Sequence, residues 1–449
     1  MGAPELSRVD LRSSLVAPAA ASERIGLEIE SGVVDPRTGL AAPYRGAGGM
    51  RAVLEAVLAE WDGKALFDEG ELTGVELAAG GLIGLEHGGQ LEYSAPPAAD
   101  VATAVDDVRL TLLRLSELLR RFDLALLPGA HLPFDRIETV PWAPLSRSPL
   151  MRGHFAGLGE SGSGGARILS MSTCTQVHLD HLSEDDFTQK LRMQAAASPV
   201  VAALLVNSPL NRGRLDGLLS HRSRNWLLTD PRRCGLVRPA LREDVGVDDV
   251  VDWALRIPMI YYQDAAGGLR PAPDRPFASL LRDGFDDGTR PLLGHWTAHL
   301  SQIWTHVRVR RTLELRAADG PAHQNLQVLP ALWTGLSYHA PSRAAAWELL
   351  RHYTVAQLQA TTTRFPAEGL RTTLGGDRVR ELAGELVRLA REGLRARVAA
   401  GLERPEVPAY LDPLDEVLHT GRTFAEQCAE RWETDLRQDP RRYVAHFRV

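Results

Sequence analysis

The stretch Ile25-Gly26-Leu27-Glu28-Ile29-Glu30 alternates apolar and polar residues with a period of two, which predicts a β-strand. In a strand its apolar side chains would leave one face, while Glu28 and Glu30 would leave the other, roughly 6–7 Å apart. Buried carboxylates need a compensating cation, and this spacing suits two neighbouring Mg²⁺ ions that also bind substrate phosphates. An edge strand with a solvated outer face is the alternative, and the stretch alone does not decide between them.

The composition is that of an ordinary globular protein. The chain has 449 residues, 44% of them hydrophobic and 24% charged, which permits either several domains or one large α+β enzyme domain. A net charge of −6 gives no basic footprint, so we expect no nucleic-acid and no membrane partner. Residues 1–22 lack the pattern of a secretory signal, and three widely spaced cysteines do not form a disulfide framework. We therefore expect a cytoplasmic protein.

Periodicity predicts a mixed succession of elements without an internal repeat or a linker. We expect residues 23–341 to form a catalytic core, preceded by an N-terminal segment (1–22) and followed by a C-terminal helical part of the same domain (342–449). The expected helices are 50–61, 101–122, 184–207 and most of 342–436, and the expected strands are 25–30, 74–77, 82–86, 90–94, 124–130, 171–180 and 307–316. Residues 133–165 are rich in Pro and Gly, which predicts a long irregular loop that could close over a site.

Two of the expected strands carry further polar faces. The turn Gly88-Gly89 would form a hairpin in which Glu86 and Glu92 meet, which is unfavourable unless a cation lies between them. On strand 171–180, His178 shares a face with Gln176 and Asp180, which favours a functional histidine over a structural one.

The strand 307–316 is the most informative, because its polar face would carry Arg308, Arg310, Thr312, Glu314 and Arg316. One interpretation is a solvated face with internal ion pairs. The other is an anion site, in which arginine forks bind phosphate oxygens and one carboxylate binds a bridging Mg²⁺. Several antiparallel strands lined with Glu, His and Arg favour the second interpretation and ATP-dependent chemistry.

These motifs resemble the glutamate–cysteine ligase family, in the branch of plant and many bacterial enzymes that includes the actinobacterial ligase of ergothioneine synthesis. The resemblance covers nearly the whole chain in order. It is carried by Gly26–Glu30, Glu86–Glu92, Thr173–Asp180, Asn207–Pro209, Ser220–Ser223 with Trp226 and Asp230, Leu313–Gly320, Pro330–Leu336, Leu414–Val417 and Thr420–Thr423.

The resemblance implies a glutamine-synthetase-like fold, a curved antiparallel sheet with surrounding helices. It also implies a reaction in which ATP phosphorylates the γ-carboxylate of L-glutamate and the amine of L-cysteine then forms the γ-glutamyl amide. The implied roles are metal binding by Glu28, Glu30, Glu86, Glu92, Glu314 and His178, catalysis by Arg316 and Glu314, ATP binding by Arg310 and Arg316, and substrate binding by Arg222, Ser220, Gln176 and Trp226.

Two segments depart from the family pattern, Ser146–Met151 and Thr175–Asp180. Both lie where substrates are expected, so the acceptor could be cysteine or another amine of a specialised pathway. A non-catalytic relative that acts as a regulator is a further alternative, which the retention of all five carboxylates disfavours. We expect a monomer or a homodimer, with Mg²⁺ and ATP required for activity.

Overall fold

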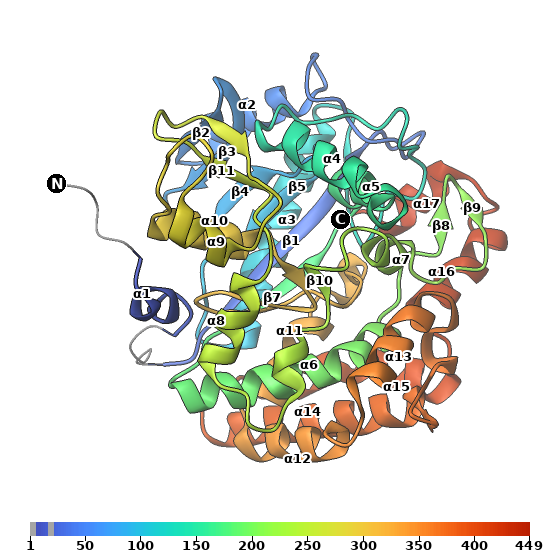
Figure 1. The fold of residues 1–449 in the computed structure, drawn as a ribbon. Coiled ribbons are helices and arrows are strands. Elements are labelled where there is room, and N and C mark those ends of the chain that lie inside the picture. Colours follow the sequence, from blue (N-terminus) through green and yellow to red (C-terminus); the bar gives the residue numbers. More distant parts are fainter. Residues whose placement is uncertain (1–5, 17–21) are drawn as a thin grey trace.

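The computed structural model, which describes residues 6–16 and 22–449, is built around one large antiparallel sheet (Figure 1). The strand order is β14-β15-β7-β1-β5-β4-β3-β2, and β6 also pairs with β1. The strands are β1 (Ile25–Val34), β2 (Gly63–Asp68), β3 (Glu71–Leu77), β4 (Leu82–Leu85), β5 (Leu91–Ser94), β6 (Ala125–Pro128), β7 (Thr175–Leu179), β14 (Val307–Val309) and β15 (Leu313–Leu315). The expected α+β class with an antiparallel sheet is confirmed.

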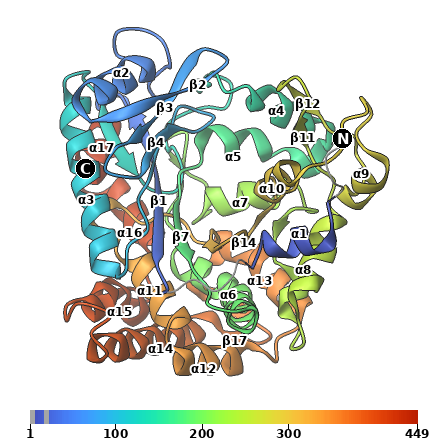
Figure 2. The same ribbon diagram turned by 90° about the vertical axis from the view of Figure 1, so that its left-hand side faces the viewer.

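Strand β1 lies at the centre of the sheet, and its alternation decides which face is covered. Ile25, Leu27 and Ile29 are at most 1% exposed and belong to the main hydrophobic core. Helix α3 (Val101–Arg120) packs against β1 and β6, and its first turn is capped by the Asp100 side chain. Figure 2 shows α3 on one side of β1, with α5 and α7 on the other.

A layer of helices packs below the sheet in the view of Figure 1. It contains α6 (Glu184–Leu204), α11 (Val328–Ser337), α12 (Ala340–Leu350), α13 (Val355–Glu368), α14 (Val379–Ala399) and α15 (Asp412–Thr420). Helices α16 (Phe424–Glu433) and α17 (Pro440–Phe447) lie at the right-hand side of Figure 1, where α17 packs against β6. The helical prediction for 342–436 is confirmed, apart from the short hairpin of β16 (Thr373–Leu374) and β17 (Asp377–Arg378). A capping box of Thr423 and Glu426 is present at the start of α16.

The segment 133–165 corrects one prediction, because much of it is helical. Helices α4 (Arg147–Gly157) and α5 (Gly165–Met171) flank a 3-10 turn at Gly159–Gly162. Met151 and Phe155 of α4 are buried against Leu169 of α5. This tertiary packing stabilises helices in a segment whose Pro and Gly content predicts a loop, so the expected flexible closing loop is wrong for residues 147–165.

Two predicted strands also differ from the structure. The strand expected over 171–180 begins only at Thr175, because Met171 ends α5. The strand expected over 307–316 is a hairpin of β14 and β15, in which the Arg310 N–H donates to the Thr312 carbonyl at 3.0 Å. Its turn contains no Gly, Pro or Asn, so the continuing alternation imitates a single long strand. Strand β2 was not predicted.

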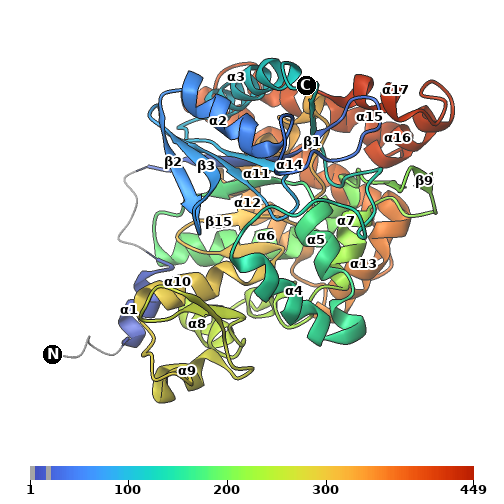
Figure 3. The same ribbon diagram turned by 90° about the horizontal axis from the view of Figure 1, so that it is seen from above.

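Between β7 and β14 the chain inserts short elements that the sequence patterns do not predict. They are β8 (Leu210–Asn211), β9 (Arg214–Leu215), α7 (His221–Leu227), β10 (Cys234–Gly235), α8 (Val247–Leu255), β11 (Tyr261–Gln263), β12 (Leu269–Pro271), α9 (Phe277–Asp283), α10 (Leu293–Ser301) and β13 (Trp304–Thr305). Helix α1 (Arg8–Ser13) packs beside α8 and α10 at one corner of the molecule (Figure 3). Helix α2 (Met50–Glu60) covers β3. In the described residues, each helix is too short or too polar to cross a bilayer.

Candidate active site

The five carboxylates predicted as metal ligands lie on adjacent strands of the central sheet. Glu30 of β1 pairs directly with Glu92 of β5, and Glu314 of β15 pairs with His178 of β7. The negative charges are close enough to repel one another. The charge of Glu86 raises the pKa of Glu30 and of Glu92, and Glu28 repels both Glu92 and Glu314. The sheet therefore brings together Glu28, Glu30, Glu86, Glu92, Glu314 and His178, which we call the carboxylate wall.

One end of the carboxylate wall has the geometry of a cation site. Glu28, His178 and Glu314 each offer a ligand atom, and these atoms lie within 4.8 Å of one another. Nε2 of His178 is 3.2 Å from Oε1 of Glu28. Gly26 pairs with His178 across the sheet, and a Cβ at Gly26 would stand 3.1 Å from the His178 Cβ. The glycine thus leaves room for the histidine ring.

Two arginines neutralise Glu314, which is fully buried. Nε of Arg308 donates to Glu314 Oε2 at 2.6 Å, and Nη1 of Arg316 donates to Oε1. Burial alone would raise the pKa of Glu314, but the two guanidinium charges hold it well below its ordinary value. The pKa of Arg316 is raised because the charge of Glu314 outweighs burial. Both arginines are therefore positioned by the same carboxylate.

The other carboxylates of the wall are less well compensated. Burial and the charge of Glu86 raise the pKa of Glu30 to about 7, despite Arg316 and Arg222. Burial raises the pKa of Glu92 well above its ordinary range, and its charged neighbours, three carboxylates, raise it further. Burial also raises the pKa of Glu28, but the charge and the hydrogen bond of His178 outweigh this effect, so the pKa of Glu28 is lowered. Because the like charges repel, the wall favours a bound cation.

Arg222 extends from α7 to the same end of the sheet as Arg316. Its Nη1 donates to the Ala318 carbonyl at 3.0 Å, and its Nη2 donates to the Arg316 carbonyl at 2.9 Å. Ser220 caps α7 and donates to Asp319 at 2.9 Å, while Asp319 lies 3.8 Å from Arg222. Ser220 is fully buried, so its hydroxyl is engaged by protein groups in this structure.

Gln176 and Trp226 contact the site in different ways. Nε2 of Gln176 donates to Oε1 of Glu30 at 2.8 Å, so the buried amide orients a wall carboxylate. Trp226 lines two cavities that adjoin each other, and its ring lies 6.0 Å from the Arg316 guanidinium carbon.

Cys174 accepts a hydrogen bond from Arg222 and is buried. Burial raises the pKa of its thiol to about 12, so it remains a neutral thiol.

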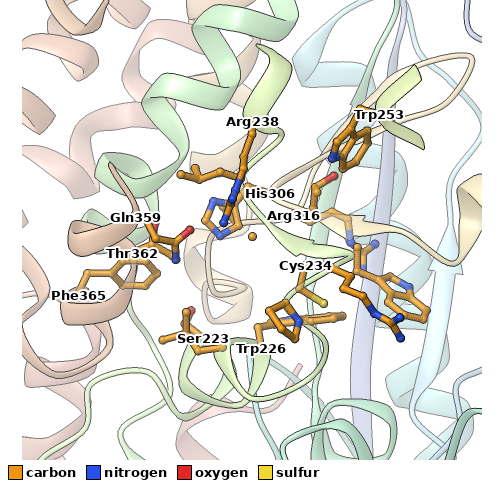
Figure 4. A pocket seen from close by; sticks show the side chains of 18 residues that line it. Ser223, Trp226, Cys234, Arg238, Trp253, His306, Arg316, Gln359, Thr362 and Phe365 are labelled. Atoms are coloured by element: carbon orange, nitrogen blue, oxygen red, sulfur yellow. The ribbon is translucent and has the colours of Figure 1, made fainter. Parts of the chain in front are cut away.

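Two neighbouring cavities lie on the Arg222 side of the carboxylate wall. The smaller, about 80 Å³, is lined by Glu30, Glu86 and Arg222. The larger, about 370 Å³, lies beyond Arg316 and is shown in Figure 4. Arg316, Trp226 and Trp304 line both, so they form the boundary between the two cavities.

A third cavity, of about 280 Å³, reaches the opposite end of the wall at His178. It is lined by Arg310, Arg311 and Thr312 of the β14–β15 turn, and by Ser14 after α1. Arg310 is therefore an exposed residue of this cavity and does not lie beside Arg316 on one strand, as the predicted long strand required. The wall thus lies between a cationic opening and the Arg222–Arg316 side.

Sequence reasoning gave no role to several residues that shape the site. Asp319, within the motif Leu313–Gly320, accepts hydrogen bonds from the Ser208 and Ser220 hydroxyls and from the Asn207 N–H. Arg147 of α4 is 4.0 Å from Glu86. Asp230, at 0% side-chain exposure, pairs with Arg233 at 2.7 Å, and its Asp-x-x-Arg spacing near Arg222 is a signal that could have indicated this pair.

Comparison with known proteins decides the family. The family model for glutamate–cysteine ligase family 2 (GCS2) matches residues 24–446. The chain belongs to this family. It is 31% identical over 365 residues to the chloroplastic glutamate–cysteine ligase of Arabidopsis thaliana, covering 79% of this chain and 67% of that one. It is 29% identical over 440 residues to glutamate–cysteine ligase B of Oryza sativa subsp. japonica, covering 96% and 84%.

Solved structures show the same fold for this glutamate–cysteine ligase family member. The glutamate–cysteine ligase of Francisella tularensis in complex with AMP matches with a TM-score of 0.56 at 12% identity, over 96% of this chain and 89% of that one. The bifunctional glutathione synthetase of Pasteurella multocida matches with a TM-score of 0.51 at 11% identity, over 98% and 52%. The ligase family expected from the sequence motifs is confirmed.

The residues of the carboxylate wall fit the Mg²⁺ that this ligase family implies. Mg²⁺ is a hard cation that binds carboxylate oxygens and keeps further positions for water and phosphate. The wall offers several such oxygens, and the charges of Glu28, Glu86 and Glu30 all raise the pKa of Glu92. A cation would remove the repulsion that raises the pKa of Glu30 and Glu92.

Proposed function

We propose that this chain is an ATP- and Mg²⁺-dependent ligase that joins the γ-carboxyl group of L-glutamate to an amine through a γ-glutamyl phosphate. The observation that carries the proposal is the carboxylate wall between a cationic cavity at His178 and Arg310 and the cavities at Arg222 and Arg316. Phosphoryl transfer needs its two substrates in line and their charge neutralised. ATP entering at Arg310 and glutamate at Arg222 would meet that requirement.

The residues of the wall have separate roles in this proposal. Glu28, His178 and Glu314 would hold one Mg²⁺, and Glu30, Glu86 and Glu92 would hold another. Bound Mg²⁺ supplies neutralisation of the phosphate charge. Arg316 would bind the transferring phosphoryl group with its guanidinium fork, held in place by Glu314, while Arg310 would contact the outer phosphates of ATP.

The glutamate donor would be recognised by its α-carboxylate at Arg222. The guanidinium is 1% exposed and already donates to two backbone carbonyls, which leaves its orientation fixed. Ser220 and Asp319 would position Arg222, and Gln176 would keep Glu30 directed into the smaller cavity. Trp226 would contact the substrate where the two cavities meet.

L-Cysteine is the first acceptor to test, because the relatives are named glutamate–cysteine ligases. A different amine is the second candidate, favoured by the larger cavity and by the departures at Ser146–Met151 and Thr175–Asp180. The amine nitrogen would attack the γ-carbonyl carbon, forming the C–N bond as the C–O bond to phosphate breaks. We further propose that the chain acts in the cytoplasm as a monomer or a homodimer.

The experiment combines the protein with ATP, Mg²⁺, L-glutamate and single amines, and it identifies products by mass. A γ-glutamyl amide and one ADP-forming turnover per amide are expected. The variant Glu30→Gln should form neither, while the matched variant Glu76→Gln, outside the wall, should behave as the wild type. Turnover without glutamate, or full activity of Glu30→Gln, would contradict the proposal.

A further inference from the structure

The cavity of about 370 Å³ beyond Arg316 has a chemical character that a small thiol amino acid does not require. We propose that it is the acceptor site, and that it takes a primary amine carrying a planar aromatic body and an anionic group. The inference deepens the proposed ligase function and rests on it. Four observations support it: the aromatic walls, the size, the one-signed charge of the lining and an unpartnered histidine nitrogen.

Aromatic side chains from separate elements enclose the cavity. Trp226 comes from α7, Trp253 from α8, Trp304 precedes β14 and Phe365 comes from α13. Figure 4 shows Trp226, Trp253 and Phe365 around a common hollow. Trp226 and Trp304 are tilted at 38° with ring centroids 6.3 Å apart. Such walls bind planar rings by stacking and edge contacts.

The size of the cavity also favours a larger acceptor. Its volume of about 370 Å³ compares with about 80 Å³ for the cavity at Arg222 that would hold the donor. Cavities of about 300–1,000 Å³ typically hold drug-sized ligands. Cysteine has a handful of non-hydrogen atoms and would leave most of the aromatic surface in contact with water.

The charge of the lining favours an anionic group on that ligand. Among the described residues of the lining, three are arginines and none is Asp or Glu. Arg316 lies at the boundary with the donor cavity, and Arg232 is paired with Asp274 at 2.8 Å. Arg238 is exposed, and Figure 4 shows its side chain directed into the hollow. A carboxylate at that end would bind Arg238 through a charge-assisted pair.

His306 adds a polar contact within the same lining. In the part of the chain that the structure describes, its buried Nδ1 has no hydrogen-bond partner. Burial and the charge of Arg222 lower the pKa of His306 to about 4, so the ring is neutral. A buried nitrogen without a partner is costly, and a polar group of the ligand would satisfy it.

The reaction needs the amine at the boundary and the aromatic body in the cavity. From there the nitrogen would pass Arg316, Trp226 and Trp304 to reach the γ-glutamyl phosphate. The new C–N bond replaces the C–O bond, inorganic phosphate leaves with the electron pair, and the amine releases its proton to water. ATP supplies the phosphoryl group, so no further reactant is required.

The first part of the test compares amines with the wild-type protein. The panel contains L-cysteine, glycine, L-tryptophan, L-tyrosine, 3-aminobenzoate and phenethylamine, which has no carboxylate, each with ATP, Mg²⁺ and L-glutamate. At least one aromatic anionic amine should exceed cysteine in kcat/KM by about tenfold or more, since each well-packed apolar group contributes about 10–200-fold. Phenethylamine should be used less well than its carboxylated counterparts.

The second part uses residues that line only the large cavity. Trp253→Ala should lower kcat/KM for the best aromatic amine by about tenfold, and Arg238→Ala should raise KM for carboxylated amines but not for phenethylamine. Glutamate-stimulated ADP release without an amine should stay unchanged in both variants. Trp142→Ala and Arg256→Ala are matched controls, because neither residue lines this cavity.

Three results would overturn the inference. Cysteine could be the best acceptor with Trp253→Ala unaffected, which would leave the ligase function intact. Trp253→Ala and Arg238→Ala could raise KM for ATP alone, which would assign the cavity to the nucleotide. Absence of glutamate-dependent ADP release from the wild type with every amine would overturn the proposed function and this inference together.

Discussion

The carboxylate wall and the cavity lined by Trp226, Trp253, Trp304 and Phe365, which we call the aromatic cavity, are built by different parts of the chain. The wall comes from β1, β5, β7 and β15 and from the residue after β4, where strand pairing sets each side chain beside the next. The cavity comes from short elements between residues 223 and 317 and from the longer helix α13, which tertiary packing brings together. In the proposed function the wall would activate the donor, whereas the segments around the cavity could take a different acceptor without disturbing the wall.

The largest effect is expected at the boundary of the two regions. Arg316→Lys keeps the positive charge but loses the guanidinium fork, so turnover should fall on the order of 10²-fold or more. Ion pairing with Glu314 should keep the fold intact, as circular dichroism would show. Unchanged turnover would mean that Arg316 is only a structural ion-pair partner.

Glu92→Gln tests whether the wall is a strained assembly that sacrifices stability for function. Its charged neighbours are carboxylates, so removing one charge should stabilise the protein without Mg²⁺ by about 0.5–2 kcal/mol. Turnover should fall by about 10²-fold because a ligand is lost. The two measurements are thermal unfolding and ADP release. A variant that unfolds at a lower temperature would contradict the assumed repulsion.

Asp135 is a buried carboxyl group outside both regions and serves as a reference for burial alone. Burial raises its pKa to about 6, although it accepts the Ala41 N–H. Between the ordinary value of 3.8 and about 6, the folded state binds more protons than the unfolded chain, so the free energy of unfolding falls as pH rises through that window.

Asp135→Asn should therefore be more stable than the wild type above pH ~6, on the order of 2 kcal/mol, and should lose that advantage below pH ~4. Urea unfolding at several pH values measures the difference. Equal stability of the two proteins across the range would refute the shift.

The smallest effect is expected from the glycine opposite His178. Gly26→Ala would bring a Cβ to within 3.1 Å of the His178 Cβ, and the ring must shift. The Mg²⁺ concentration for half-maximal ADP release should rise a few-fold, less than the roughly 10–100-fold typical of a lost supporting contact. Gly84→Ala is the control, since nothing lies within 4 Å of its added Cβ. Identical Mg²⁺ dependence in both variants would mean that His178 takes no part in binding the cation.

The sequence predicted the wall because period-two alternation places side chains without knowledge of tertiary structure. Glu28, Glu30 and His178 fell on the expected strand faces, and Gly89, with φ of +79°, forms the expected turn between Glu86 and Glu92. Strand order did not follow from the pattern, so the contact between His178 and Glu314 became visible only through the register of β7 and β15.

The cavity could not be predicted for a physical reason. Several of its residues lie on short elements such as β10, β13 and α7, which have too few residues for a clear periodicity, and others come from the longer helix α13. Only long-range packing brings these elements together around one cavity. The turn at Arg310–Thr312 was not predicted either, because it contains no Gly, Pro or Asn and the alternation of apolar and polar residues continues through it. The hydrogen bond from Ser220 to Asp319 likewise depends on a contact between residues 99 positions apart, which the local pattern does not contain.

The central claim is that the carboxylate wall activates the γ-carboxylate of glutamate, and donor-dependent ADP release tests it most directly. With ATP and Mg²⁺, L-glutamate should stimulate release, L-aspartate should be too short to bring its carboxylate to the wall, and L-glutamine should lack the carboxylate. Arg222→Gln should abolish the stimulation by glutamate, because the donor α-carboxylate loses its partner. Equal stimulation by the three amino acids, or none by glutamate, would contradict the account.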